Sequence, residues 1–304
     1  MRSKRFSYVP FFIVIVFIVL MFIIQTVRQA LFFSSRNRVS IAVLAPHAFV
    51  ISYDKKTAIT NVVYFNTNAQ VTVPGGYGWY YLYSVPLLGK IEHREFDIAR
   101  HTFEELVGAP IDAIIIPAHS DIIDVSQEPF IEWFFANRRE FLSIFSRKYK
   151  TSTRNSIDWH FFRTIVSTRK DKLVFVDGST GLVSTKNNGL RYHAEKLDLT
   201  VKGFLYWTYP SREGAVNIFV AQDQYSAGVR IGRIVEGAGM KVLGVETTVR
   251  APGSCMLIGA HLHKDTLYSL ASYFGCSTKL KDIEPYSRGI IDFYIDRKIG
   301  ILYK

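Results

Sequence analysis

Cysteine is nearly absent from this chain: Cys255 and Cys276 are the only two among its 304 residues. Two cysteines exclude a disulfide-rich scaffold and a zinc centre built from four thiolates. The eight histidines are scattered without the short spacing of metal ligands. His261 and His263 would point to opposite sides of an extended backbone. The sequence therefore predicts no metal site.

Three motifs of well-known enzyme classes are also missing. The chain contains no G-x-S-x-G, no G-x-x-x-x-G-K-[ST] and no G-x-G-x-x-G. These patterns place a serine nucleophile on a tight turn or wrap backbone amides around phosphates. Their absence argues against a serine hydrolase, a P-loop nucleotide-binding enzyme and a dinucleotide-binding enzyme.

Acidic residues are absent from the first 38 positions, which carry six Lys or Arg. Between these cations, Phe6–Val27 is uncharged and mostly apolar. A helix needs about 20 such residues to cross a bilayer. Residues 1–38 are therefore predicted to form a cytoplasmic tip and one transmembrane anchor.

A cleaved signal peptide is the alternative interpretation of this segment. Its apolar core would normally be shorter, about 7–15 residues. Cleavage after Ala30 would also put Arg28 where a small residue is required. We favour an uncleaved signal-anchor in the cytoplasmic membrane, single-pass, with the N-terminus inside and the bulk of the chain extracytoplasmic.

The formal net charge of +11 is unevenly distributed. Residues 138–172 hold ten Lys or Arg against three acids, and with the first 38 residues they account for all of the excess. Such a pattern is not the spread basic surface of a nucleic-acid-binding protein. Aromatics lie within the basic segment, so it either packs amphipathic helices on a core or binds anionic lipid or polymer. The aromatics are Phe141, Phe145, Tyr149, Trp159, Phe161 and Phe162.

Residues 39–183 are predicted to form an α/β domain. Three runs rich in β-branched residues, 38–45, 48–54 and 58–66, indicate strands, and Asp54-Lys55-Lys56 is a hairpin turn. Residues 95–108 have helical spacing and end in Gly108, and 111–117 is typical of a buried strand. Two helices are expected within 128–172 and a further strand at 173–177.

The last ninety residues are predicted to be a separate α+β domain, 214–304, after a linker at 184–213. Their periodicity gives the order β-α-β-β-α-β, with helices at 226–239 and 264–275 and a final strand at 290–296. The two cysteines fall at one end of this domain. Outside the cytoplasm they could form a disulfide, and two free thiols are the alternative.

The stretch VTVPGGYGWYYLY, residues 71–83, is the strongest candidate for a binding loop. A glycine-rich loop holds phosphate when it opens a helix N-terminus, but here strand-forming residues surround it. A turn between strands with packed aromatics is therefore favoured. The candidate ligand-binding residues are Gly75, Gly76, Tyr77, Gly78 and Trp79, together with Arg94 and Arg100.

Residues 54–116, DKKTAITNVVYFNTNAQVTVPGGYG…FEELVGAPIDAIII, resemble the core of the LytR-CpsA-Psr family. Residues 216–247, VNIFVAQDQYSAGVRIGRIVEGAGMKVLGVET, are similar to the LytR C-terminal domain. The resemblance implies a single-span extracytoplasmic protein of the cell envelope. It also implies transfer of glycopolymer from a polyprenyl-pyrophosphate carrier to the cell wall, with arginines on the pyrophosphate and aspartates on a divalent ion such as Mg²⁺.

This sequence departs from the family pattern at those charged positions. The family's R-S-D motif falls on Leu44-Ala45-Pro46, and its P-R-D motif falls on Asn66-Thr67-Asn68. A pyrophosphate leaving group needs guanidinium and a cation to absorb its developing charge. We therefore expect a pseudoenzyme without catalytic residues, cofactor or metal, which binds an anionic envelope polymer or lipid-linked glycan, or serves as a scaffold for a partner protein. A phosphotransferase rebuilt around Arg94 and Arg100 is the alternative, with Mg²⁺ as cofactor, and a transcription regulator is a weaker one.

Overall fold

The structure is a computed structural model. It describes residues 9–30, 38–118, 128–138, 148–153, 156–167, 170–185, 189–206, 215–249, 253–260, 264–281 and 290–304. Phe141, Phe145, His261 and His263, named above, lie outside these ranges, as does a further histidine, His119.

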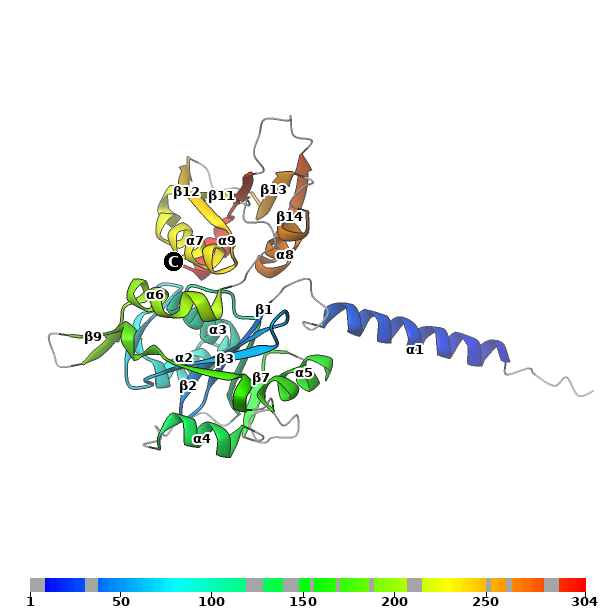
Figure 1. Cartoon of the computed structure of the whole chain (residues 1–304). Helices are drawn as coiled ribbons and strands as arrows, with labels where there is room; N and C mark the ends of the chain where they lie inside the picture. Colours follow the sequence, from blue (N-terminus) through cyan, green and yellow to red (C-terminus); the bar gives the residue numbers. More distant parts are fainter. Residues whose placement is uncertain are drawn as a thin grey trace, which may run out of the picture.

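The apolar N-terminal segment forms one helix, α1 (Val9–Gln29), apart from the rest of the chain (Figure 1). Its apolar side chains from Phe12 to Ile24 are exposed. The structure describes the side chains of residues 12–27 of this helix. Within the described residues, no helix meets the length and apolarity that a membrane crossing requires.

The larger unit, which we call the N-terminal unit, comprises the described residues between 38 and 206 and is built on a six-stranded sheet. The strand order is β7-β6-β1-β2-β3-β8. The strands are β1 (Arg38–Leu44), β2 (Ala48–Asp54), β3 (Ile59–Phe65), β6 (Ala113–Pro117), β7 (Tyr149–Thr151) and β8 (Leu173–Asp177). The predicted hairpin is confirmed, because β2 pairs with β3 through a turn at residues 55–58.

The residues of the central strand β1 are apolar and buried on both faces of the sheet. Such strands need cover on each side, and helices pack on both faces. On one face lie α4 (Phe130–Asn137) and α5 (Ser156–Val166), whose described aromatics pack into the core. The two helices predicted within residues 128–172 are confirmed, and their aromatics Phe130, Phe134 and Phe162 are buried. On the other face lie α2 (Val85–Ile91), α3 (Glu95–Val107) and α6 (Ala194–Leu205).

A smaller four-stranded sheet, in the order β5-β4-β10-β9, borders α3 and α6. It contains β4 (Gln70–Val73), β5 (Gly78–Tyr81), β9 (Leu182–Ser184) and β10 (Leu190–Tyr192). Strands β4 and β5 form a hairpin around the glycine-rich loop. Gly75, Gly76 and Gly78 all have φ near +87°, a backbone conformation that favours glycine. The predicted turn between strands is confirmed, but its aromatics are only partly packed, because Trp79 and Tyr81 are exposed.

The segment predicted to be a linker, 184–213, differs from that prediction. It contributes β10 and the twelve-residue helix α6 to the N-terminal unit. Leu197, Val201 and Leu205 recur at helical spacing and are fully buried in its core. These three were overlooked among the polar residues of the segment. Residues 207–214 lie outside the described part of the chain.

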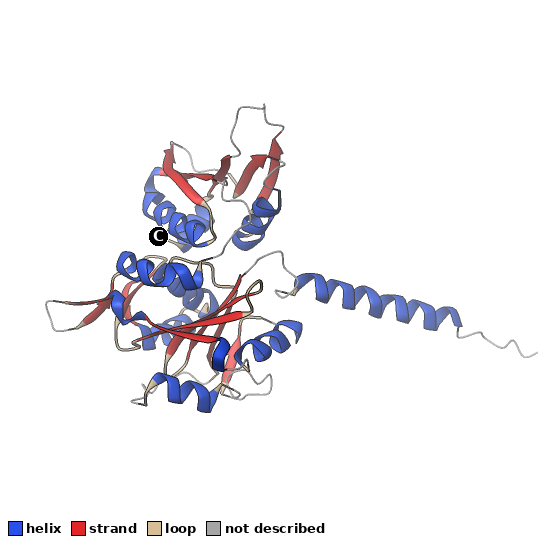
Figure 2. Cartoon of the chain, in the orientation of Figure 1, coloured by secondary structure: helices blue, strands red, loops and turns tan. Residues whose placement is uncertain are grey.

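The C-terminal unit comprises the described residues between 215 and 304 and contains a sheet whose five described strands lie in the order β12-β11-β15-β13-β14. It contains β11 (Ala215–Ala221), β12 (Lys241–Thr248), β13 (Met256–Ala260), β14 (Ser277–Lys281) and β15 (Ile290–Tyr294). Its helices are α7 (Tyr225–Gly237), α8 (Lys264–Phe274) and α9 (Arg297–Leu302), and all three lie on the side facing the N-terminal unit (Figure 2). The predicted order β-α-β-β-α-β is incomplete, because it lacks the strand β14 and the helix α9. The alternating Ser-Thr-Lys-Leu-Lys of β14 leaves one apolar side chain to signal a strand.

Cys255 and Cys276 form a disulfide, which resolves the alternatives left open by the sequence. The two residues immediately precede the paired strands β13 and β14. The bridge therefore ties two neighbouring strands at one end of the sheet.

Replacing both cysteines with serine is expected to lower the free energy of unfolding by about 3 kcal/mol, because the bridge closes a loop of 21 residues. Urea unfolding of the oxidised protein and the variant would measure the change. Reductant should shift the wild-type midpoint towards that of the double variant and leave the variant unchanged. Equal midpoints for all samples would contradict the prediction.

Candidate functional site

A cavity of about 440 Å³ lies between the small sheet, α3 and α6. Its apolar wall includes Val71 of β4, Leu106 of α3 and Val183 of β9. Arg191, His193 and Glu105 contribute charged or ionisable groups. A mostly apolar cavity with a few convergent polar groups is typical of small-molecule sites.

Arg191 of β10 is held in a fixed position at the cavity wall. Its Nε and Nη2 donate hydrogen bonds to Gln70 Oε1 at 3.3 and 3.0 Å. Its guanidinium lies 4.0 Å from the centre of the Trp79 ring, within cation–π range. The β4–β5 hairpin therefore supplies the aromatic ring that contacts this cation, and the neighbouring strand β10 supplies the cation.

The start of α6 adds a second positive element. Ala194, the first residue of α6, and the preceding His193 both line the cavity. The first amide groups of a helix lack partners within it and favour a negative charge. Together with Arg191, this helix start makes the polar end of the cavity suitable for a phosphate.

Glu105 borders the cavity from α3 and is buried. Its Oε1 lies 3.7 Å from Arg230 Nε and 3.6 Å from Arg233 Nη1, two residues of α7. Burial raises the pKa of Glu105, although the two guanidiniums act in the opposite direction. Among the described residues, its Oε2 has no hydrogen-bond partner. The carboxyl is thus compensated mainly by the C-terminal unit.

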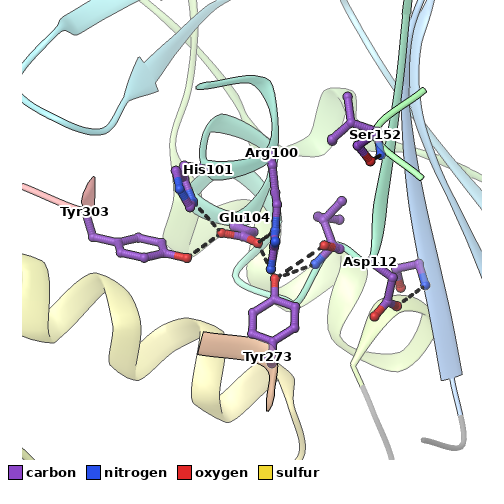
Figure 3. A network of polar contacts seen from close by, with 10 residues as sticks. Arg100, His101, Glu104, Asp112, Ser152, Tyr273 and Tyr303 are labelled. Carbon is purple, nitrogen blue, oxygen red and sulfur yellow. Dashed lines mark hydrogen bonds and ion pairs between the residues drawn. The ribbon is translucent and has the colours of Figure 1, made fainter. Parts of the chain in front are cut away.

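The neighbouring residue, Glu104, joins the two units through a buried network (Figure 3). Its Oε1 accepts from Arg100 Nε at 2.7 Å and from the Tyr273 hydroxyl. Its Oε2 accepts from the Tyr303 hydroxyl at 2.7 Å and lies 3.0 Å from His101 Nδ1. Burial by itself would raise the pKa of Glu104, but Arg100 and these hydrogen bonds lower it to about 2. The carboxylate is therefore charged at neutral pH.

The structure separates the candidate residues predicted from the sequence. Trp79 lines the cavity, and Tyr77 donates a hydrogen bond to Glu92 at 3.0 Å. Arg94 borders a different, open hollow and lies 3.8 Å from Asp97. Arg100 is bound to Glu104 and lies 4.6 Å from the Tyr273 ring centre. Arg94 and Arg100 therefore do not converge on the cavity.

The positions that match the family's charged motifs are structural in this chain. Leu44 and Ala45 are fully buried, and Thr67 is nearly so. The Asn66 side chain caps a turn by accepting a hydrogen bond from the Asn68 amide at 2.9 Å. No group of three or more His, Cys, Asp or Glu suited to a metal occurs in the described ranges. The residues present do not fit the Mg²⁺ that the resemblance implies.

Sequence reasoning missed Arg191, His193 and Glu105. The first two lie in the segment predicted to be a linker, and Glu105 lies in a helix predicted only from its apolar spacing. Arg191 alternates with Leu190 and Tyr192 in a short run just before a helix, which was the available signal.

Comparison with known proteins gives matches at the level of structure. No protein-family model and no curated protein matches the chain. A structure titled "TagT bound to LIIa-WTA" has a TM-score of 0.42 and 10% sequence identity, covering 55% of this chain and 89% of that chain. Bacillus subtilis TagV has a TM-score of 0.39 and 12% identity, covering 56% of this chain and 96% of that chain.

A third structure is titled "LytR-CPS2A-psr family protein YwtF (TagT) with bound octaprenyl pyrophosphate lipid". Its TM-score is 0.39 and its identity 10%, covering 55% of this chain and 88% of that chain. At such values the function has to be argued from this chain's own residues. Over about 55% of its length, the chain is similar in fold to proteins of the LytR-CpsA-Psr family.

Proposed function

We propose that this protein is a non-catalytic component of the cell envelope that binds a lipid-linked, phosphate-bearing glycan. The cavity beside the β4–β5 hairpin carries this proposal, because an apolar wall meets Arg191 and the start of α6 there. An isoprenoid or alkyl chain fits the apolar wall, and a phosphate fits the cationic end.

The positions of the charged residues support a function without phosphoryl transfer. Arg100, the arginine on which a rebuilt active site would depend, is bound to Glu104 and Tyr273. Leu44 and Thr67 occupy positions where the family resemblance implies arginine, and Pro46 and Asn68 occupy those where it implies aspartate. Binding without phosphoryl transfer is therefore the simpler function for these residues.

A position outside the cytoplasm forms part of the same proposal. The Cys255–Cys276 disulfide is of a kind that persists in oxidising compartments. The exposed apolar side chains of α1 suit contact with lipid. We propose that residues 1–38 anchor the protein in the cytoplasmic membrane and that the two units lie outside.

Replacing Arg191 with glutamine is expected to weaken binding of farnesyl pyrophosphate by roughly 10–100-fold, because a charge-assisted hydrogen bond contributes about 1.5–3 kcal/mol. Titration calorimetry on the full-length chain would measure this, with farnesyl pyrophosphate as a soluble probe of the class. Binding of uncharged farnesol should change little.

Lys241→Gln is the matched control, since it removes an exposed cation from the edge strand β12. It should leave both affinities unchanged. Equal loss in Lys241→Gln and Arg191→Gln would reduce the effect to net charge and contradict a phosphate site in the cavity. Turnover of a pyrophosphate-linked glycan by the wild-type chain would contradict the non-catalytic assignment.

A further inference from the structure

Two helices that border the cavity, α3 and α6, are tied together by a side chain from the other unit. Arg233 of α7 donates from Nε and Nη2 to the two carboxylate oxygens of Asp198 on α6, at 3.1 and 2.8 Å. Its Nη1 donates to the backbone carbonyl of Glu105 on α3 at 3.0 Å. One planar guanidinium thus spans both helices.

The surroundings leave this side chain little freedom. The Arg233 side chain is 18% exposed, and that of Asp198 is 22% exposed. A Cβ added to Gly108 would lie 2.9 Å from Asp198 Oδ1 and 3.2 Å from Arg233 Nη2. Burial lowers the pKa of Arg233, but Asp198, Glu105 and Tyr206 together outweigh burial and raise the pKa above its ordinary value, so the group stays charged. A bidentate, partly buried pair of this kind fixes distance and orientation together.

The position of the bridge relates it to the cavity. Glu105 and Leu106 of α3 form one side of the cavity, and Ala194, one turn before Asp198, belongs to another. The separation of these two helices therefore determines the width of the cavity between them.

We propose that Arg233 is a positioning residue that sets the width of the cavity and hence the size of the lipid chain it accepts. The C-terminal unit is then a structural part of the binding site. This inference rests on the proposed function, because it assumes that the cavity holds the prenyl chain.

Arg230 is a matched control in the same helix. It is also an arginine near Glu105, at 3.7 Å, but its Nη1 donates to the backbone carbonyls of Tyr303 and Lys304. In the described contacts it does not reach α6. If Arg233 acts only through its positive charge, replacing Arg230 should change ligand binding as much as replacing Arg233. If Arg233 acts as a bridge between α3 and α6, only its own replacement should change the preference for chain length.

The test compares Arg233→Met and Arg230→Met for binding of geranyl, farnesyl and geranylgeranyl pyrophosphate to the full-length chain. Arg233→Met should lose roughly 10-fold in affinity for the preferred probe and should flatten the preference among the three chain lengths. Arg230→Met should keep the wild-type order. A general loss of stability would lower all three affinities by the same factor.

Hydrogen exchange gives a readout that needs no ligand. Amides at residues 197–205 should exchange faster in Arg233→Met than in Arg230→Met, because α6 has lost its tie to α3. If Arg233→Met does not fold, Asp198→Asn serves in its place, since it weakens the α6 end of the bridge and keeps the bond to Glu105.

The outcomes separate the two proposals. Suppose that no pyrophosphate probe binds the wild type, while hydrogen exchange in α6 rises only in Arg233→Met. The proposed function is then wrong, but the structural role of Arg233 as a bridge between α3 and α6 is supported. If the wild type binds and Arg233→Met retains both its affinity and its order of chain lengths, the positioning role is wrong.

Discussion

Replacing Glu104 with glutamine is expected to destabilise the protein by about 3–5 kcal/mol, the cost of removing one partner from a buried ionic network. The glutamine side chain has one acceptor oxygen in place of two charged ones. Arg100, His101, Tyr273 and Tyr303 would then surround a neutral amide whose NH₂ group faces donors. Burial raises the pKa values of both tyrosines, so they remain protonated donors at neutral pH.

The pH dependence gives this prediction a second signature. The pKa of Glu104 falls from 4.5 to about 2 on folding. Its contribution to stability, about 3 kcal/mol, is therefore present above pH 4.5 and is lost as the pH falls towards 2. The difference between wild type and Glu104→Gln should shrink over that range. Urea unfolding at several pH values would measure it.

Asp97→Asn is the matched control, because it makes the same chemical change in the same helix. The Asp97 side chain is 64% exposed, and its nearest cation, Arg94, is 3.8 Å away. Exposed pairs of this kind contribute about 0–1 kcal/mol. A Glu104→Gln variant as stable as Asp97→Asn would show that the network does not hold the units together.

Local patterns in the sequence predicted the elements that depend on local chemistry. The β2–β3 hairpin, helix α3 ending at Gly108 and the glycine turn all followed from turn residues, caps and periodicity. Gly108 has a φ of +59°, as expected of a helix-terminating glycine.

The cavity and the network could not be predicted in this way, because their residues come together only in three dimensions. Glu104 and Glu105 are adjacent in sequence, yet one binds tyrosines near the C-terminus and the other lies beside arginines of α7. Periodicity marks Phe103 and Leu106 as buried but cannot show that the two acids between them are buried as well.

The role of a charged residue is hard to predict for the same physical reason: its partners can be distant in the sequence. The local sequence offers Arg100 two acidic neighbours one turn away, Asp97 and Glu104, and does not show which other group its guanidinium contacts. Its remaining neighbour, Tyr273, is 173 residues distant along the chain and lies with its ring 4.6 Å from the guanidinium. A resemblance to a family can therefore locate a fold while leaving the role of each charged residue open.

Replacing Gly237 with alanine is expected to separate the two units, with a loss of about 3 kcal/mol or more, at the upper end for overpacking. Gly237 ends α7, and a Cβ there would lie 2.0 Å from the Gly108 carbonyl oxygen and 2.6 Å from the Ala109 Cα. Both are backbone atoms, so no side-chain rotation relieves the contact.

The same helix provides a control in Gly232, where an added Cβ would make contacts of 3.5 Å or longer. Gly232→Ala should be neutral or stabilising by up to about 1 kcal/mol, because alanine is the better helix former. The Gly237→Ala change should move α7 away from α3, and with it Arg233 from Glu105 and Asp198. It should therefore increase hydrogen exchange at residues 197–205, as is expected for Arg233→Met. If Gly237→Ala unfolds at the same urea concentration as Gly232→Ala, the units do not meet through this backbone contact, and the C-terminal unit cannot control the cavity through α7.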